Sequence, residues 1–303
     1  MAVELKDLST LLGALSDATR LRLLVLCAAG ELTVKELTEA TDMSQPRVSR
    51  HLRILEEAGI LRRFRDQHWV YYRLRADGPA APLARAAIAL LARTDADVRA
   101  DARRLDEVLA ARAREARAAA GGDSDEVLQP SAWALLEQAI RDMGRKALGP
   151  DGLGELLDVG TGSGRVLRVL GPDAKRGIGI DASRPARLAA RTALHDAGLA
   201  HCSVRDADMY ALPFDKESFD TVSISRVLSG AQLPWAALSE AVRVLRPSGR
   251  LLVFDVLPEG MPLDAWCQSL KGWLTAARIE VLSEQRLALP GGCAVLYLGS
   301  PQP

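Results

Sequence analysis

The sequence has few groups suited to metal or disulfide chemistry. Its four cysteines lie far apart, at Cys27, Cys202, Cys267 and Cys293. Because no CxxC or CxC pair exists, neither a disulfide framework nor a thiolate metal site is expected. Histidine is also scarce, and none occurs between His68 and His195.

Long apolar runs are missing as well. The longest, LRLLVLCAA and ARAAIALLA, are interrupted by arginine and fall short of the roughly 20 apolar residues that a membrane span needs. The N-terminus, MAVELKDLST, lacks the basic start and apolar stretch of a secretory signal. These absences predict a cytoplasmic protein with no membrane partner.

Arginine is concentrated in one part of an otherwise balanced chain. The whole sequence carries 39 Lys+Arg and 39 Asp+Glu. Residues 44–75, by contrast, contain eight arginines against Glu56, Glu57 and Asp66. A local excess of positive charge can bind the phosphate backbone of a nucleic acid, although most runs of charged residues are simply solvated surface.

The order of the patterns indicates two domains. A length of 303 residues with 48% hydrophobic content suffices for two packed cores. We expect the first domain at residues 1–119 and the second at residues 127–303, separated by the break AGGDSDE. Short helices followed by paired strands predict an α+β first domain. Alternating strands and helices predict a doubly wound α/β second domain with a Rossmann-like sheet.

Two short helices and a tight turn are predicted between residues 17 and 57. Asp17 can cap ATRLRLLVLCAA, and TVKELTEAT leads to a turn at Asp42-Met43. In the next helix Val48, Leu52 and Leu55 fall on one face, which should pack inward. The N-terminus and opposite face of this helix offer side chains that can bond base edges or phosphates: Ser44, Gln45, Arg47, Ser49, Arg50 and His51. The pattern is typical of a helix-turn-helix.

A β-hairpin is predicted directly after these helices. The segment ILRRFRDQHWVYYRL consists of two alternating runs joined by Asp66-Gln67-His68. Arg63, Arg65 and His68 are expected to face DNA from this wing. The block from ELTVKEL to VYYRL resembles the winged helix-turn-helix of the ArsR/SmtB repressors, and the resemblance extends over about residues 5–110. It implies a homodimer that binds a double-stranded operator with an inverted repeat, while a winged helix used only for protein contacts stays the alternative.

The stretch ELTVKEL speaks against a metal sensor. Members of that family that sense soft metals have thiolates where this chain has Thr33 and Lys35. Others use histidines on their last helix, where this chain has none. No metal is therefore expected.

Residues 81–118 predict a dimerising helix. A series with a spacing of seven comprises Ala84, Leu91, Val98 and Leu105, accompanied by Ile88, Ala102 and Leu109. Two alternatives remain open: a helix that packs only on its own domain, and a split at Thr94-Asp95.

The stretch ELLDVGTGSGRVLRVLGPDAKRGIGIDAS predicts a strand, a tight glycine turn, a helix and a second strand. The second strand ends at Asp181, where a carboxylate can accept hydrogen bonds from both hydroxyls of a ribose. Folds that bind nicotinamide dinucleotides share such a glycine trio, so this pattern alone does not decide the ligand.

Five motifs together, DVGTGSG, GIDAS, DMYALPF, FDTVSI and LRPSGRLLV, resemble the class I S-adenosylmethionine-dependent methyltransferase fold over about residues 127–303. The resemblance implies S-adenosylhomocysteine or S-adenosylmethionine as the ligand. It places Asp158 and the loop of Gly160, Thr161, Gly162 and Gly164 along the methionine moiety, Asp181 at the ribose, and Asp208 and Met209 at the adenine. Ala182 and Arg226 are expected as further ligand contacts. Taken without the resemblance, the glycines are plain turn residues and Asp208 is a surface acid.

For the second domain, a ligand sensor and an active methyltransferase remain two alternatives. Methyl transfer needs mainly positioning, so the lack of an acid/base cluster in RVLSGAQLPW and DVLPEGMPLDAW does not exclude catalysis. No catalytic residue is nevertheless assigned. Arg226 and Asp255 either touch a bound molecule or are strand-end residues satisfied by backbone. The fusion resembles S-adenosylhomocysteine-responsive repressors of methionine-cycle genes; the alternative is an active methyltransferase with a DNA-binding regulatory domain.

Overall fold

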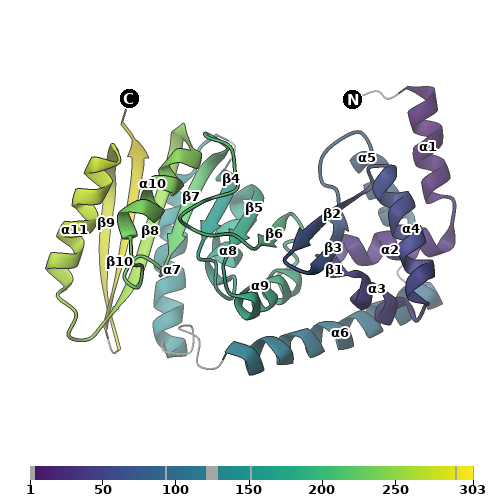
Figure 1. Cartoon of the computed structure of the whole chain (residues 1–303), viewed down its shortest axis with the longest axis horizontal. Coiled ribbons are helices and arrows are strands. Elements are labelled where there is room, and N and C mark those ends of the chain that lie inside the picture. The colour runs from purple at the N-terminus through teal and green to yellow at the C-terminus, as the bar shows by residue number, and fades with distance from the viewer. Residues whose placement is uncertain (1–3, 93, 121–128, 151, 291, 303) are drawn as a thin grey trace. The chain divides into compact units, whose positions relative to one another are not determined.

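The computed structural model describes residues 4–92, 94–120, 129–150, 152–290 and 292–302. Its internal contacts divide the chain into two compact units, Met1–Glu115 and Ala116–Pro303, which we call the N-terminal and C-terminal units. Residues 121–126 of the expected break lie outside the described residues. Each unit is coloured along the chain in Figure 1.

The N-terminal unit contains a small antiparallel sheet among helices. Its elements are α1 (Leu5–Leu15), α2 (Ala18–Ala29), β1 (Leu32–Thr33), α3 (Val34–Thr41), α4 (Gln45–Glu57), β2 (Leu61–Asp66), β3 (Trp69–Leu74), α5 (Ala81–Leu90) and most of α6 (Ala96–Ala120), whose last residues are assigned to the C-terminal unit. The sheet order is β1-β3-β2. The predicted helix-turn-helix and wing are therefore α3, α4 and the β2–β3 hairpin.

Local signals account for where these helices begin and end. The Asp17 carboxylate accepts a hydrogen bond from the Arg20 backbone N–H at 3.0 Å, as a cap should. Asp42, in the turn between α3 and α4, has a φ of 54°. Ser44 stands at the N-cap of α4 as expected, but its side chain makes no capping hydrogen bond. Val48, Leu52 and Leu55 are fully buried in the core of the unit, so the inward face of α4 is confirmed.

The single helix expected over residues 81–118 is interrupted. α5 ends at Leu90 and α6 begins at Ala96, so the alternative of a split at Thr94-Asp95 is correct. The Asp95 carboxylate accepts from the backbone N–H groups of Asp97 and Val98 and so starts a new helix. Leu105 and Leu109 pack into the core of their own unit. The seven-residue series is therefore divided between two helices, and part of it packs inside the unit, while dimerisation stays a prediction.

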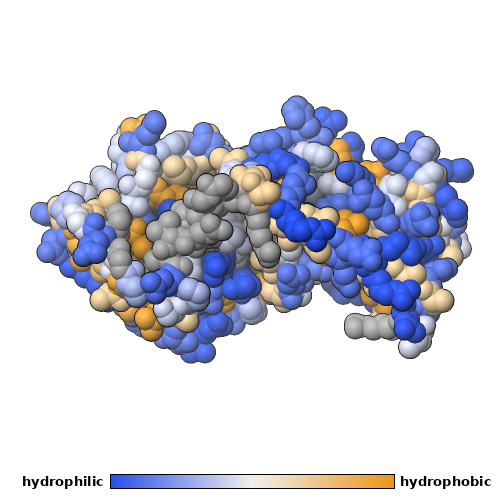
Figure 2. Space-filling model, turned by 90° about the horizontal axis from the view of Figure 1, so that it is seen from below, coloured by the Kyte–Doolittle hydropathy of each residue, from blue (hydrophilic) through white to orange (hydrophobic). Residues whose placement is uncertain are grey.

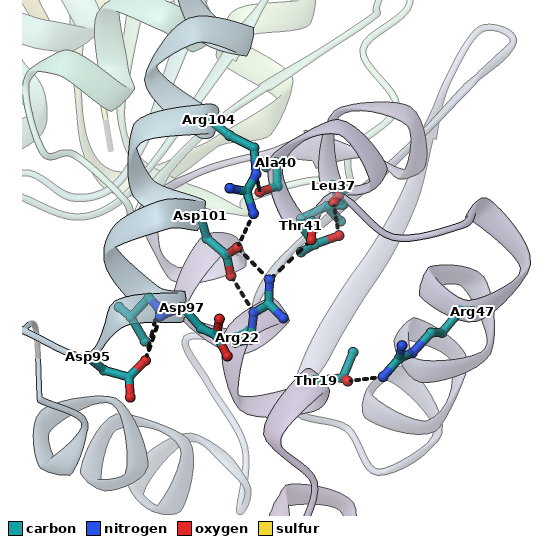
Figure 3. A network of polar contacts seen from close by, with 11 residues as sticks. Thr19, Arg22, Leu37, Ala40, Thr41, Arg47, Asp95, Asp97, Asp101 and Arg104 are labelled. Atoms are coloured by element: carbon teal, nitrogen blue, oxygen red, sulfur yellow. Dashed lines mark hydrogen bonds and ion pairs between the residues drawn. The ribbon is translucent and has the colours of Figure 1, made fainter.

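Charged contacts hold α6 against the helix-turn-helix (Figure 3). Arg22 of α2 donates from Nε and Nη2 to the two carboxylate oxygens of Asp101, at 2.7 and 2.6 Å. Its Nη2 also donates to the Thr41 carbonyl at 3.1 Å, and Arg104 Nε donates to the Ala40 carbonyl at 3.1 Å. Arg22 of α2 and Arg104 of α6 therefore satisfy carbonyl groups at the C-terminal end of α3, which that helix cannot satisfy itself.

The C-terminal unit is built on one seven-stranded sheet. Its elements are α7 (Pro130–Ala147), β4 (Gly154–Val159), α8 (Arg165–Leu170), the short 3-10 helix η1 (Gly171–Asp173), β5 (Ala174–Ile180), α9 (Arg184–Asp196), β6 (Cys202–Arg205), β7 (Phe219–Ser225), α10 (Pro234–Val244), β8 (Leu245–Pro258), α11 (Leu263–Ala276), β9 (Ile279–Leu289) and β10 (Gly292–Pro301). The strand order is β6-β5-β4-β7-β8-β10-β9.

This order places a binding crevice at β4. Six strands run in the same direction, and β10 is antiparallel to both of its neighbours, β8 and β9. After β4 the chain first adds β5 and β6 on one side and later β7 and β8 on the other, so the winding direction reverses there. Open α/β sheets bind ligands at such a switch point, beyond the carboxyl ends of the strands. The doubly wound class is confirmed.

Both faces of the sheet are covered. One core cluster contains apolar residues of α7, α8 and α9 together with strand residues. The other contains apolar residues of α10 and α11. The helices labelled in Figure 1 thus enclose the sheet from two sides, as a largely parallel sheet requires.

The surface offers little continuous apolar area. The face drawn in Figure 2 is mostly hydrophilic, with small separate hydrophobic patches. Isolated apolar residues such as Leu90 and Trp235 are exposed, which is ordinary for a folded chain. Within the described ranges, none of the helices combines the length and apolar character needed to cross a bilayer.

Candidate functional sites

Most of the predicted DNA-facing side chains are exposed in the N-terminal unit. These are Ser44, Gln45, Arg47, Arg50, Arg63, Arg65 and His68, while Ser49 is half-buried. Arg47 contacts the N-terminal end of α2, where its Nη2 donates a hydrogen bond to the Thr19 hydroxyl at 3.2 Å. An exposed guanidinium anchored in this way loses less rotamer freedom on binding a phosphate.

His51 differs from its neighbours on α4. Its side chain is only 15% exposed, and Nδ1 lies 3.6 Å from Asp17 Oδ1. Burial lowers the pKa of this imidazole, against an opposing effect of the Asp17 carboxylate. The imidazole thus has a partner inside its own unit and is only partly available to DNA.

The positive side of the wing consists of Arg62, Arg63 and Arg65, which are exposed on β2. Arg73, opposite Arg62 on β3, is buried. Its Nη1 lies 4.0 Å from a carboxylate oxygen of the buried Glu31. This arginine of the run therefore lies inside the unit and does not add to the positive surface.

The stretch ELTVKEL forms the N-terminus of α3, and a capping box stands there. Glu36 accepts at 2.7 Å from the Thr33 backbone N–H, while the Thr33 hydroxyl accepts from the Glu36 N–H at 3.2 Å. From α6, Arg112 lies 3.2 Å from Glu36 Oε1 and donates to the Glu31 carbonyl at 3.1 Å. In the part of the chain that the structure describes, no group of three or more His, Cys, Asp or Glu residues could hold a metal ion.

The glycine turn after β4 is the centre of the second site. Gly160, Gly162 and Gly164 have φ values of 71°, 53° and 80°, in the left-handed region that favours glycine. A Cβ on Gly160 would collide with the Val227 side chain, and one on Gly164 would lie 3.0 Å from Ala190 Cα. The turn thus needs glycine for its backbone conformation and for close packing.

A cavity of about 100 Å³ opens at this turn. It is lined by Trp133, Gly160, Thr161, Gly162, Arg165, Val166, Asp181, Ser183, Ala186, Ser225, Arg226, Val227 and Phe254. Pockets for small organic ligands usually measure about 300–1,000 Å³. The cavity is therefore large enough for only part of a nucleoside ligand.

The ten predicted ligand contacts fall into two groups. Those that line the cavity are Gly160, Thr161, Gly162, Asp181 and Arg226. Those that do not are Asp158, Gly164, Ala182, Asp208 and Met209. The structure brings the predicted tail and ribose contacts together, but not the predicted adenine contacts.

Asp181 is held rigidly at the end of β5. One carboxylate oxygen accepts from the Gly162 backbone N–H at 2.9 Å, and the other from the Ser183 N–H at 2.8 Å. These bonds tie the glycine turn to the start of α9. A carboxylate in this position presents its remaining lone pairs to the cavity, where hydroxyl donors of a ligand can reach them.

Asp158 lies behind the glycine turn and is fully buried. Its Oδ1 accepts from the hydroxyls of Ser223 and Ser225 on β7, both at 2.7 Å. Burial raises the pKa of this carboxyl to about 6, although the serine bonds lower it. Its side chain therefore links β4 to β7 beneath the cavity.

At the predicted adenine end, Asp208 is exposed and its carboxylate accepts from the Tyr210 backbone N–H at 2.9 Å. Met209 is half-buried against the core. Arg187 of α9, next to Asp181 and Asp206, is a residue that the sequence reasoning missed. Its buried Nη1 donates to the Asp181 and Ala182 carbonyls at 2.8 Å and lies 2.9 Å from Asp206 Oδ1. Nothing in the pattern of α9 marks this arginine as internal.

Asp255, at the end of β8, is satisfied by its surroundings. One oxygen accepts from the Ser229 backbone N–H at 2.7 Å and the other from the Ser229 hydroxyl at 2.9 Å. Burial raises the pKa of this carboxyl. The structure therefore favours the interpretation of Asp255 as a strand-end residue that holds the loop after β7.

Comparison with known proteins gives the two units their families. Residues 17–63 match the model of the bacterial regulatory proteins of the arsR family. Residues 157–253 match a methyltransferase domain model. The chain joins an arsR-family DNA-binding domain to a methyltransferase domain. The two matches coincide with α2 through β2 and with the sheet around the glycine turn.

Individual relatives agree with this division. The arsenic resistance transcriptional regulator ArsR1 of Pseudomonas putida is 54% identical over 66 residues, 22% of this chain and 52% of that protein. The transcriptional repressor SdpR of Bacillus subtilis is 36% identical over 61 residues, 20% of this chain and 68% of that protein. Demethylmenaquinone methyltransferase of Clavibacter sepedonicus is 31% identical over 127 residues, 42% of this chain and 51% of that protein. The chain thus spans about half the length of the first and third of these relatives.

Proposed function

We propose that this chain is a cytoplasmic, homodimeric transcriptional regulator whose methyltransferase unit serves as its sensor. The arsR-family unit binds an inverted-repeat operator through α4 and the wing. The methyltransferase unit binds S-adenosylhomocysteine or S-adenosylmethionine at the glycine turn. Binding of this ligand changes the affinity of the dimer for its operator and thereby controls genes that recycle S-adenosylhomocysteine.

The composition of the cavity wall is the observation that carries this proposal. Its charged groups are Asp181, already bonded to two backbone N–H groups, and the guanidinium groups of Arg165 and Arg226. An arginine stays protonated at neutral pH and exchanges no proton with a substrate. The wall therefore offers polar contacts for a bound molecule, and its arginines offer no general acid or base.

The adenosyl ligand fits part of this site. Asp181 would accept from ribose hydroxyls, and the glycine turn lets backbone approach the tail. When bound, S-adenosylmethionine supplies an electrophilic methyl group, whereas S-adenosylhomocysteine supplies none. The cavity of about 100 Å³ lies below the usual range for ligand pockets, so the rest of either molecule would extend beyond it or displace side chains around it.

Active methyl transfer is the second candidate, and the methyltransferase family match favours it. Such a displacement depends mainly on positioning, so it needs no proton-transfer group. Incubation with radiolabelled S-adenosylmethionine and operator DNA, protein or cell extract distinguishes the two. Transfer of label at a steady rate would make the chain an enzyme.

Calorimetry with each nucleoside, followed by operator binding at saturating ligand, tests the sensor directly. We expect binding and a change in operator affinity of about 5- to 150-fold, which corresponds to a coupling free energy of about 1–3 kcal/mol. Asp181→Ala should abolish the response and leave operator binding without ligand intact. Asp196→Ala, an exposed acid at the end of α9, is the matched control. Operator affinity that stays constant across a full ligand titration would contradict the proposal.

A further inference from the structure

Another cavity, of about 540 Å³, lies at the opposite end of the same sheet. It is lined by residues at the amino ends of β4, β5, β7 and β8 and by the segment that precedes β4. The glycine turn follows the carboxyl end of β4, and a strand of six residues is about 20 Å long. This cavity, which we call the basic cavity, is therefore separate from the one at the glycine turn. Its volume falls within the usual range of ligand pockets, about 300–1,000 Å³.

Positive charge dominates the wall of the basic cavity. Four of its lining residues are basic and two are acidic: Lys175, Arg176, Arg246 and Arg250 against Glu155 and Asp220. Among the described residues, the wall thus carries a net charge of +2. A cleft lined mainly by charge of one sign concentrates ions of the opposite sign.

Both acidic side chains of the basic cavity are already paired. Glu155 Oε2 accepts from Arg176 Nε at 2.6 Å, across the pairing of β4 with β5. One Asp220 oxygen accepts from the Glu155 backbone N–H at 2.8 Å, and the other pairs with the Arg246 guanidinium. These two ion pairs account for both carboxylates and for two of the four basic groups.

The other two basic groups, Lys175 and Arg250, have no carboxylate partner in the described parts of the chain. Arg250 Nη1 donates to the Ser248 and Gly249 carbonyls, both at 3.0 Å, which anchor the guanidinium without neutralising it. Lys175 is exposed at the start of β5. Because β4 and β7 lie between β5 and β8, the two charges stand on opposite sides of the basic cavity.

We infer that the basic cavity binds a small molecule that carries a chain of phosphate groups. Three strand spacings of about 4.8 Å each separate the backbones of β5 and β8. A chain of phosphates can reach the side chains of both Lys175 and Arg250, whereas a single phosphate meets one of them. Arginine pairs with phosphate oxygens through its planar donors, and lysine binds phosphate as a point charge. The inference does not depend on the proposed function, because it concerns the other end of the sheet.

Calorimetry with tripolyphosphate tests this site on the full chain, in buffer without divalent cations. Lys175→Gln and Arg250→Gln should each weaken binding about two- to fivefold, as is usual for exposed charge pairs. The double variant should show about the product of the two effects. Arg141→Gln is the matched control, because Arg141 is an exposed arginine of α7 that does not line the cavity. It should leave the affinity unchanged. Melting temperatures without ligand show whether each variant is folded.

Cytidine triphosphate and cytidine monophosphate distinguish a free phosphate chain from one attached to a nucleoside. Cytidine is used because it lacks the adenine that the other cavity is proposed to accept. If the triphosphate binds as tightly as tripolyphosphate, the natural ligand is a nucleotide, and if it binds more weakly, the ligand is a free phosphate chain. The monophosphate should bind more weakly than either, because it cannot reach both charges.

Binding at the DNA-facing surface is the outcome that would overturn the inference. The exposed Arg63 of the wing also attracts phosphate. If Arg63→Gln weakens tripolyphosphate binding and the two cavity variants do not, the phosphate chain binds the arsR-family unit instead. No measurable binding by wild-type protein would equally refute the site. Saturating S-adenosylhomocysteine should not displace tripolyphosphate, because the two cavities lie at opposite ends of β4.

Discussion

Replacing Asp158 by Asn should make the methyltransferase unit less sensitive to pH. Burial raises the pKa of the Asp158 carboxyl from 3.8 to about 6. The folded state therefore holds this proton more tightly than the unfolded state does. Between these two pKa values the folded form binds more protons, so its stability falls as pH rises.

The size of the effect follows from the two pKa values. Their difference corresponds to about 3 kcal/mol of destabilisation, fully present above the folded pKa and absent below 3.8. Between about pH 5 and pH 8 the Asp158 contribution should change by about 1.4 kcal/mol. Asn keeps an oxygen that can accept from Ser223 and Ser225, but it carries no charge.

Urea unfolding followed by tryptophan fluorescence measures this change. Four of the five tryptophans belong to the C-terminal unit, namely Trp133, Trp235, Trp266 and Trp273, so the signal reports mainly on that unit. The free energy of unfolding of Asp158→Asn minus that of wild type should increase as pH is raised, because only the wild type loses stability. Asp196→Asn, which removes an exposed charge, should show no such trend. If wild type and Asp158→Asn change in parallel from acidic to alkaline pH, burial does not destabilise the Asp158 carboxylate.

Two further predictions concern the arsR-family unit. Arg47→Ala and Arg50→Ala should each weaken operator binding by about 1–3 kcal/mol if the side chain contacts a base. If the side chain contacts a phosphate instead, the slope of log affinity against log salt concentration should become shallower by about 0.9. Titrations at several salt concentrations measure both effects, and unchanged affinity in both variants would refute the assignment of α4. Asp101→Ala should destabilise the unit by about 3–5 kcal/mol, because it leaves the Arg22 guanidinium without its buried partner. Circular dichroism during urea unfolding measures the loss, with the exposed Asp106→Ala on the same helix as control.

The sequence predicts best those features that a short stretch decides by itself. Asp17, as a helix cap, and the inward series at Val48, Leu52 and Leu55 depend on neighbours a few positions away. The glycine turn after β4 is equally local, because its backbone requires residues without a Cβ. For this reason the helix-turn-helix, the wing and the doubly wound sheet could all be predicted.

Features that depend on long-range packing could not be predicted in this way. Whether Arg73 points to solvent or to Glu31 is decided by elements about 40 residues apart. Trp133 precedes the glycine turn by more than 25 residues, and no spacing links it to Arg165 or Arg226. The extent of the cavity is likewise set by side chains from several elements. Only Arg165 had a local signal, since it directly follows the turn.

Capping and charged contacts meet at the N-terminus of α3. Thr33 stands in a capping box with Glu36, and Arg112 of α6 reaches that same carboxylate. At the other end of α3, Arg104 of α6 donates to the Ala40 carbonyl. A helix of 25 residues extends about 37 Å and bends little, so a shift of α6 changes both contacts together. A displacement of α6 would therefore act on charged hydrogen bonds at both ends of α3, the helix that precedes α4.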